Sequence, residues 1–169
     1  MTAHHVLELK NNGYTILDQI IPKEVLTDLS VAVDKAFVEH KALQVENNSD
    51  IKSDGVALHA LLSDDTFVKL LQFLIDTGFI QELQDIYFTG TCILNSLSAL
   101  NNLPNCPNFS AAVHRDLRFY SRDLPVMLNC LIMVDDFTVE NGGTYLLPES
   151  HLEERKPSNE EFSSKAVQA

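Results

Sequence analysis

The 169-residue sequence predicts an α+β domain, with helices in about residues 1–88 and strands in about residues 89–169. In the first part, apolar residues recur at three- and four-residue steps, which is the period of a helix with one buried face. After Thr91, apolar residues alternate or form short runs between clusters of Pro, Gly and Asn, which is typical of strands. Helices followed by strands favour one α+β domain spanning residues 1–169.

Composition and charge narrow the class of protein. Hydrophobic residues make up 45% and charged residues 21%, as in ordinary globular proteins. The net charge of −12 would repel phosphate backbones, so we expect no nucleic-acid partner. No secretory signal is visible, and no apolar run approaches the roughly 20 residues that cross a bilayer. We therefore expect a cytoplasmic protein with no membrane partner, whose oligomeric state the sequence leaves open.

The three cysteines fit a reduced protein. Their odd number argues against a disulfide framework, and their spacing does not resemble a metal site. Cys92 and Cys130 lie inside apolar runs, so we expect them to be buried thiols.

The helices begin near the N-terminus. Thr2 is a candidate N-cap for a helix over residues 2–11, which Asn12-Gly13 ends before a short β-prone stretch, Tyr14–Leu17. Pro22 suits the first turn of a second helix that runs to about Leu43. Its predicted apolar face consists of Leu26, Leu29, Val33, Ala36 and Phe37.

Residues 45–55 are polar and predict a surface loop. A helical segment is predicted over residues 57–62, where His59 is expected to be an ordinary packed or surface histidine. Ser63-Asp64-Asp65 then caps another helix, which Gly78 ends, and residues 80–87 predict one more short helix. The apolar face of the capped helix is predicted to be Phe67, Leu70, Leu71, Leu74 and Ile75.

The predicted strands begin at Thr91–Leu100, where Ile93, Leu97 and Ala99 would share one side. A turn-rich loop over residues 101–110 leads to further strands through His114, over residues 126–134 and over residues 144–147. A hairpin turn is expected at residues 141–143, because Asn-Gly-Gly allows positive φ angles. Residues 149–166 predict an exposed excursion, after which residues 167–169 begin another strand.

His114 and Asp116 form the candidate chemical site. Residues two apart in a strand project from the same face, so the imidazole and the carboxylate would lie side by side. Such a pair supplies two of the three ligands in the 2-His-1-carboxylate triad that holds non-haem Fe(II). The alternative is a polar pair at a strand end, salt-bridged to Arg115 or Arg118.

Four motifs in order resemble the phytanoyl-CoA dioxygenase family of Fe(II)/2-oxoglutarate oxygenases. They are the His-x-Asp pair, an apolar run followed by Asp135-Asp136, the sequence Glu-Asn-Gly-Gly at residues 140–143, and Pro-Glu-Ser-His at residues 148–151. The stretch Gly13–Leu17 before a Pro-led helix also resembles the N-terminal part of that family. One departure is Glu149, which stands where the family usually has Gly.

The resemblance implies a double-stranded β-helix, or jelly-roll, on which the N-terminal helices pack. It implies Fe(II) held by His114 and Asp116, 2-oxoglutarate as cosubstrate, and hydroxylation of a small organic substrate with release of succinate and CO2. Asn95 and Asn129 are candidate contacts for 2-oxoglutarate, although backbone groups are the commoner partners of a buried amide. Arg115 and Arg118 either bind an anionic substrate or lie in solvent. His151, in the closing motif, is not an iron ligand in that family.

Only about half of the eight strands of such a barrel can be counted. The second iron-binding His and the 2-oxoglutarate-binding Arg of the family are expected beyond Ala169, so the C-terminal strands would be missing. The first hypothesis is therefore an oxygenase whose C-terminal part is absent. The second is a truncated, non-catalytic relative that acts as a binding or interaction module. The third is a cupin-like binder that uses another metal.

Overall fold

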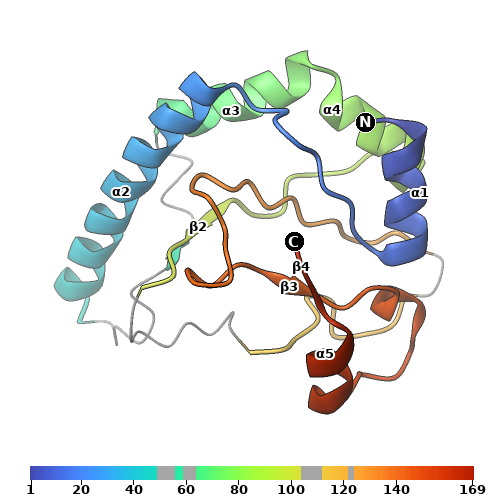
Figure 1. The fold of residues 1–169 in the computed structure, drawn as a ribbon. Coiled ribbons are helices and arrows are strands. Elements are labelled where there is room, and N and C mark those ends of the chain that lie inside the picture. The colour runs from blue at the N-terminus through green and yellow to red at the C-terminus, as the bar shows by residue number, and fades with distance from the viewer. Residues whose placement is uncertain (49–55, 59–63, 104–111, 122–123) are drawn as a thin grey trace. The chain divides into compact units, whose positions relative to one another are not determined.

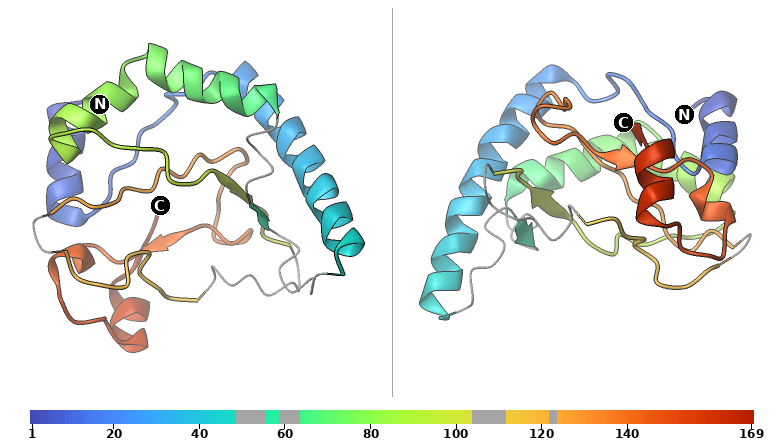
Figure 2. Two further views of the ribbon diagram at one scale, coloured as in Figure 1. Left: turned by 180° about the vertical axis from the view of Figure 1, so that it is seen from behind. Right: turned by 60° about the horizontal axis from the view of Figure 1, so that its bottom comes forward.

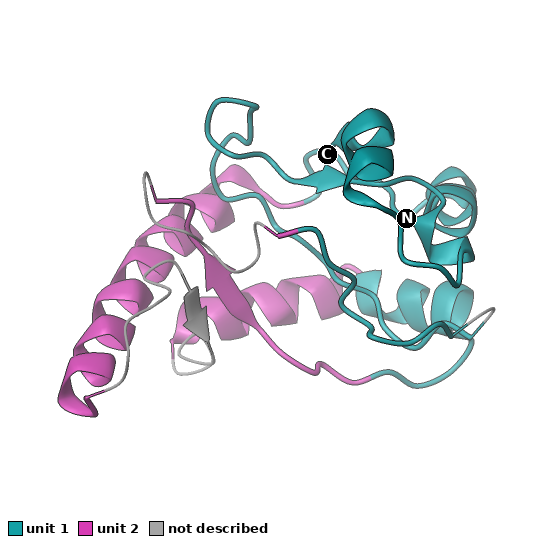
Figure 3. Ribbon diagram, turned by 90° about the horizontal axis from the view of Figure 1, so that it is seen from below, with its two compact units in different colours: residues 1–20, 79–92, 113–169 teal, residues 21–78, 93–112 magenta. Residues whose placement is uncertain are grey.

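The computed structural model describes residues 1–48, 56–58, 64–103, 112–121 and 124–169, with only the backbone described for residues 56–58 (Figure 1). It combines helices with a few short strands, so the α+β prediction is confirmed. The chain divides into two compact units (Figure 3). Unit 1 comprises residues 1–20, 79–92 and 113–169, and unit 2 comprises residues 21–78 and 93–112.

Two helices, α2 (Lys23–Glu46) and α3 (Asp65–Asp76), provide most of the buried residues of unit 2. The periodic pattern largely identified them. Pro22, however, is the N-cap of α2 and does not lie in its first turn, and the helix continues past Leu43. Ile75 was wrongly placed on the apolar face of α3, since it is 56% exposed. The buried residues of the two helices are Leu29, Ala32, Ala36, Phe67, Leu70 and Leu74.

The predicted cap of α3 is confirmed. The Asp64 carboxylate accepts a hydrogen bond from the Thr66 backbone N–H at 2.9 Å, satisfying one of the unpaired donors of the first turn. The Lys35 ammonium on α2 donates to the same carboxylate at 3.2 Å. The bonds from Thr66, followed by that from Lys35, lower the pKa of Asp64. The cap thus also connects the two helices.

The sheet of unit 2 corrects two predictions. Strand β1 (Val56–Leu58) pairs antiparallel with β2 (Ser98–Leu100). The helix predicted over residues 57–62 is therefore wrong at residues 57–58, the part of it that the structure describes. Pairing with a segment 40 residues away overrides local helix propensity. Residues 59–63, including His59, lie outside the described residues. Of the strand predicted over residues 91–100 only the last three form one, and Ile93 is 84% exposed although Ala99 is buried.

Unit 1 contains the first helix and the end of the chain. Helix α1 (Ala3–Asn12) starts at its predicted cap, Thr2. It is followed in this unit by α4 (Phe79–Glu82), the π-helical turn η2 (Leu83–Phe88), the 3-10 turn η4 (Ser150–Leu152) and α5 (Asn159–Lys165). Strand β3 (Tyr145–Leu146) pairs antiparallel with β4 (Val167–Gln168), as expected for the predicted last strand (Figure 2). The buried hydrophobic residues among those described in unit 1 are Val6, Leu9 and Leu83.

Several β predictions in unit 1 are wrong. Residues 14–17, the backbone at His114 and residues 126–134 do not form strands. The apolar run is partly open to solvent, with Leu131 54% exposed, and Cys130 is exposed where a buried thiol was expected. Cys92 is half-buried. The described strands form two separate pairs, so the jelly-roll expected from the family remains a proposal.

Candidate functional site

The side chains of His114 and Asp116 lie together in unit 1. His114 Nε2 is 3.2 Å from Asp116 Oδ1, although the backbone here bends instead of forming the predicted strand. Two adjacent ligands of an octahedral ion with bonds of roughly 2.1 Å lie about 3.0 Å apart. The separation therefore fits two neighbouring positions around one metal ion. Both side chains are about half exposed, at 52% and 48%.

Asn129 holds the other oxygen of the Asp116 carboxylate. Its side-chain amide donates to Asp116 Oδ2 at 2.5 Å, from the apolar run that the sequence predicted as a strand. Because the Asn129 amide occupies Oδ2, only Oδ1 of Asp116 faces His114. This arrangement suits a carboxylate that binds a metal ion through one oxygen. Partners that orient a ligand in this way tune metal sites.

The expected contacts of Asn95 and Asn129 with 2-oxoglutarate stay predictions. Asn129 is adjacent to the candidate metal ligands through Asp116. Asn95 is an exposed residue of unit 2.

Arg115, between the two candidate ligands, anchors the closing segment of the chain. Its Nη2 donates to the carbonyl oxygens of Ser150 at 2.8 Å and Arg155 at 2.9 Å, and its Nη1 donates to that of Glu154 at 3.3 Å. Three carbonyls around one guanidinium fix residues 150–155 beside His114. The expected substrate contacts of Arg115 and of Arg118, which is exposed, stay predictions.

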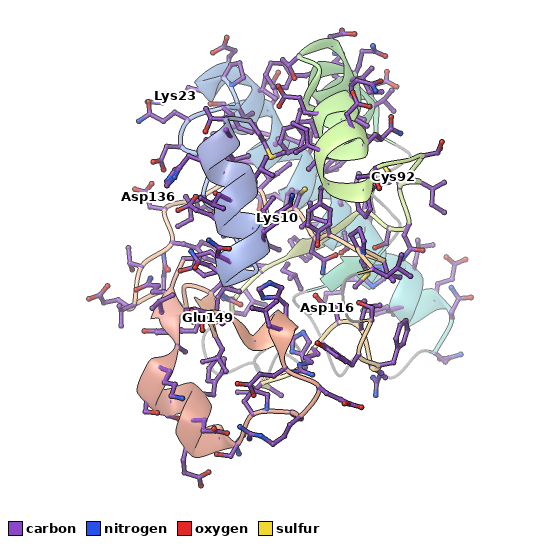
Figure 4. All side chains as sticks on the ribbon, turned by 90° about the vertical axis from the view of Figure 1, so that its right-hand side faces the viewer. Lys10, Lys23, Cys92, Asp116, Asp136 and Glu149 are labelled. Carbon is purple, nitrogen blue, oxygen red and sulfur yellow. The ribbon has the colours of Figure 1, made fainter. Side chains whose placement is uncertain are left out.

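The Pro-Glu-Ser-His motif contacts the end of α1. The Glu149 backbone N–H donates to the Asn12 carbonyl at 2.9 Å, and His151 Nε2 donates to the Lys10 carbonyl at 3.0 Å. Helices leave their last carbonyls unsatisfied, so these bonds supply the missing donors. Figure 4 labels Lys10 on this helix and Glu149 on the chain that passes its end.

Two backbone conformations make this contact possible. Gly13 has a φ of +84°, and a Cβ there would lie 2.5 Å from the His151 ring, so the close approach requires glycine. Glu149 has a φ of +63°, in the left-handed region that glycine adopts most easily. This conformation gives a physical reason for the glycine usual at the equivalent position of the family.

A pocket of about 170 Å³ lies beside the candidate metal ligands, entirely within unit 1. His114 and Arg115 line one part of it, and the contact between α1 and the closing motif lines another. Three further lining residues were not assigned to the site from the sequence, because one lies in a polar excursion and the other two lie in segments that were interpreted only as β-prone. These are Lys156, Tyr14 and Tyr145.

The candidate metal ligands within the described part of the chain are His114 and Asp116. Among the residues that the structure describes, no cluster of three or more His, Cys, Asp or Glu side chains could hold a metal ion. His114 and Asp116 thus fit two of the three protein positions of the iron triad.

Comparison with known proteins agrees with the motif order. Neither curated proteins nor solved structures gave a match to the chain. No helix within the described ranges has the length and apolar character needed to span a membrane. The family model described as phytanoyl-CoA dioxygenase (PhyH) matches residues 9–169. The chain therefore belongs to the phytanoyl-CoA dioxygenase (PhyH) family.

Proposed function

We propose that the protein is an Fe(II)- and 2-oxoglutarate-dependent oxygenase that hydroxylates a small organic substrate. Membership of the PhyH family indicates this class of enzyme at the family level. The observation that supports a role for this chain is the 3.2 Å separation of His114 Nε2 and Asp116 Oδ1, which suits two adjacent metal ligands. The jelly-roll of the family is the fold that we expect around them.

Each residue of the site has a defined task in this proposal. His114 and Asp116 hold the iron, and the Asn129 amide keeps Asp116 Oδ2 engaged so that Oδ1 binds alone. Iron with 2-oxoglutarate bound would supply O2 activation: one oxygen atom of O2 would enter the substrate and the other would leave in succinate, formed with CO2 from 2-oxoglutarate. Arg115 fixes residues 150–155 through its three carbonyl contacts, and with them the pocket wall formed by Ser150 and His151. A wall fixed in this way keeps a substrate in one orientation near the metal.

A second candidate is a non-catalytic member of the family that binds ligands without oxidising them. The observation in its favour is that the described residues include no cluster of three metal-binding side chains. Two protein ligands would hold iron weakly, and an oxidation that depends on fixed coordination would be slow.

Anaerobic titration with Fe(II), with and without 2-oxoglutarate, followed by a succinate assay in air, tests the proposal. We expect iron binding that 2-oxoglutarate strengthens, succinate formation in air, and loss of both in His114→Ala. His4→Ala is the matched control, because His4 is an exposed histidine on α1 of the same unit and should leave both unchanged.

Each alternative has its own result. Absence of iron binding in the wild-type chain would contradict the oxygenase and favour the non-catalytic binder. Metal binding that is independent of 2-oxoglutarate would favour the cupin-like alternative.

A further inference from the structure

The lining of the 170 Å³ pocket has a charge opposite to that of the chain. The protein carries 24 acidic and 12 basic residues, yet no Asp or Glu lines this pocket. Two side chains with a fixed positive charge, Arg115 and Lys156, do line it. A concave site of one charge in a protein of the other concentrates ions of the protein's own sign.

Arg115 and Lys156 differ in their exposure and in how many of their N–H donors the protein already uses. The Arg115 guanidinium already donates to three carbonyl oxygens, so it contributes charge but has few donors left for a ligand. The Lys156 side chain is exposed, at the rim formed by the polar segment before Pro157. An ammonium group has three donors in a flexible geometry and suits a single charged group.

The remaining lining is suited to the body of a small organic molecule. Tyr14 and Tyr145 contribute rings with polar hydroxyl groups, and Leu147 and Phe162 contribute apolar surface. Apolar walls with a few polar groups are typical of small-molecule sites. A volume of about 170 Å³ admits a small acid.

We propose that this pocket binds the carboxylate of a small organic substrate, with the Lys156 ammonium as its ionic partner and the Arg115 guanidinium as a fixed charge behind it. One ammonium group matches a carboxylate, which carries one negative charge, better than a phosphate dianion that demands several donors. Because His114 lines the same pocket, the acid would lie beside the candidate metal. The inference deepens the proposed function and rests on it for the reaction, but the binding step needs no iron.

Two molecules share this chemistry in the proposed reaction: a substrate that carries a carboxylate, and 2-oxoglutarate. The metal-free chain distinguishes them without reference to catalysis. Isovalerate is a probe for a monocarboxylate substrate, isovaleramide is its neutral equivalent in shape, and 2-oxoglutarate is the cosubstrate itself. The chain contains no Trp and only four Tyr, of which two line the pocket, so tyrosine ring signals in NMR spectra report binding directly.

We expect saturable shifts of the Tyr14 and Tyr145 ring signals with isovalerate and none with isovaleramide. Lys156→Met should weaken isovalerate binding about tenfold, as expected for loss of a charge-assisted contact. Lys156→Arg keeps the charge and should retain most of the binding. Lys165→Met is the matched control, because Lys165 lies in the same C-terminal segment but lines the neighbouring hollow with Glu153 and Glu161.

Competition between isovalerate and 2-oxoglutarate decides which of the two carboxylates the pocket binds. If 2-oxoglutarate displaces isovalerate, the pocket belongs to the cosubstrate. If both bind together, it belongs to the substrate. Joint binding supports the proposal, and displacement by 2-oxoglutarate would overturn it, because the pocket would then be the cosubstrate site already expected of the family. Equal binding of isovaleramide, tighter binding of inorganic phosphate, or unchanged affinity in Lys156→Met would also overturn the proposal. Because every arm is free of metal, failure here leaves the iron titration of the proposed function unaffected, and failure of that titration leaves this result standing.

Discussion

The helix pair of unit 2 and the run of residues 126–134 in unit 1 are both strongly apolar in sequence, but only the helices bury their apolar residues. Leu29 on α2 and Phe67 on α3 are each 2% exposed, whereas Val126 is 44% and Leu131 is 54% exposed. A helix satisfies its backbone within one segment, so an apolar stripe is enough to direct its packing. A strand needs a partner from elsewhere in the chain, and the described residues do not pair with residues 126–134.

Truncating one leucine from each region tests this difference most strongly. Leu29→Ala should lower the free energy of unfolding by about 3 kcal/mol, because it removes a fully buried side chain and leaves a cavity. Leu131→Ala should lower it by no more than about 0.5 kcal/mol, the range of surface substitutions. Denaturant unfolding followed by circular dichroism measures both values.

Two other outcomes of the comparison between Leu29→Ala and Leu131→Ala would contradict this difference in packing. An equal loss in the two variants would mean that residues 126–134 are packed as tightly as α2, as a central strand would be. A small loss in both would mean that the α2–α3 pair contributes little to the cooperative core. Leu43→Ala, at a position on α2 that is 52% exposed, controls for the change in helix propensity.

The partly exposed run of residues 126–134 contributes Asn129, whose amide donates to Asp116 in the candidate site. We predict that Asn129→Leu weakens Fe(II) binding by about 10- to 100-fold, the usual effect of removing a group that orients a metal ligand. Competition with a chromogenic chelator under anaerobic conditions, without 2-oxoglutarate, measures the affinity. Asn95→Leu makes the same chemical change at an exposed residue of unit 2 and should leave the affinity within about twofold. Equal weakening in both variants would contradict the role given to the Asn129–Asp116 bond.

Sequence reasoning succeeded where the structural signal was local. Thr2 and Asp64 cap their helices as predicted, and the His-x-Asp spacing brought its two side chains together even though the expected strand did not form. It failed where a distant partner decides the structure, as at residues 57–58 and 126–134. Lys156 could not be assigned to the pocket, because its position depends on carbonyl contacts of Arg115 across some 40 residues.

The closing motif offers a smaller test, at a position that the sequence singled out as unusual. Glu149→Gly should raise the free energy of unfolding by about 0.5–1 kcal/mol, because relief of a left-handed conformation outweighs the greater freedom of glycine when unfolded. Glu149→Val should lower it, since a β-branched residue tolerates positive φ poorly. Thermal unfolding of the three proteins gives the order, and a destabilised Gly variant would show that the Glu149 side chain contributes more than its backbone strain costs.

The smallest predicted effect is on the acid stability of α5 (Asn159–Lys165) in unit 1. The Arg155 guanidinium donates to both Glu161 carboxylate oxygens, at 2.6 and 2.8 Å, and this pairing lowers the pKa of Glu161 from 4.5 to about 2. A pKa that is lower in the folded state stabilises the fold above the ordinary pKa. This contribution is complete above about pH 4.5 and is lost as the pH falls toward about 2. Glu161→Gln should therefore make the stability of α5 depend less on pH between about 4.5 and about 2.

Side-chain NMR titration separates the causes of that shift. Arg155→Gln should raise the pKa of Glu161 strongly, because the bond from Arg155 is its largest cause. Lys165→Gln should raise it slightly, because Lys165 acts only through its charge. A Glu161 that titrates at its ordinary pKa in the wild-type chain would show that Arg155 does not hold this helix in solution. Residues 150–155 would then depend on Arg115 and the Tyr120 hydroxyl, which donates to the Leu152 carbonyl at 3.0 Å.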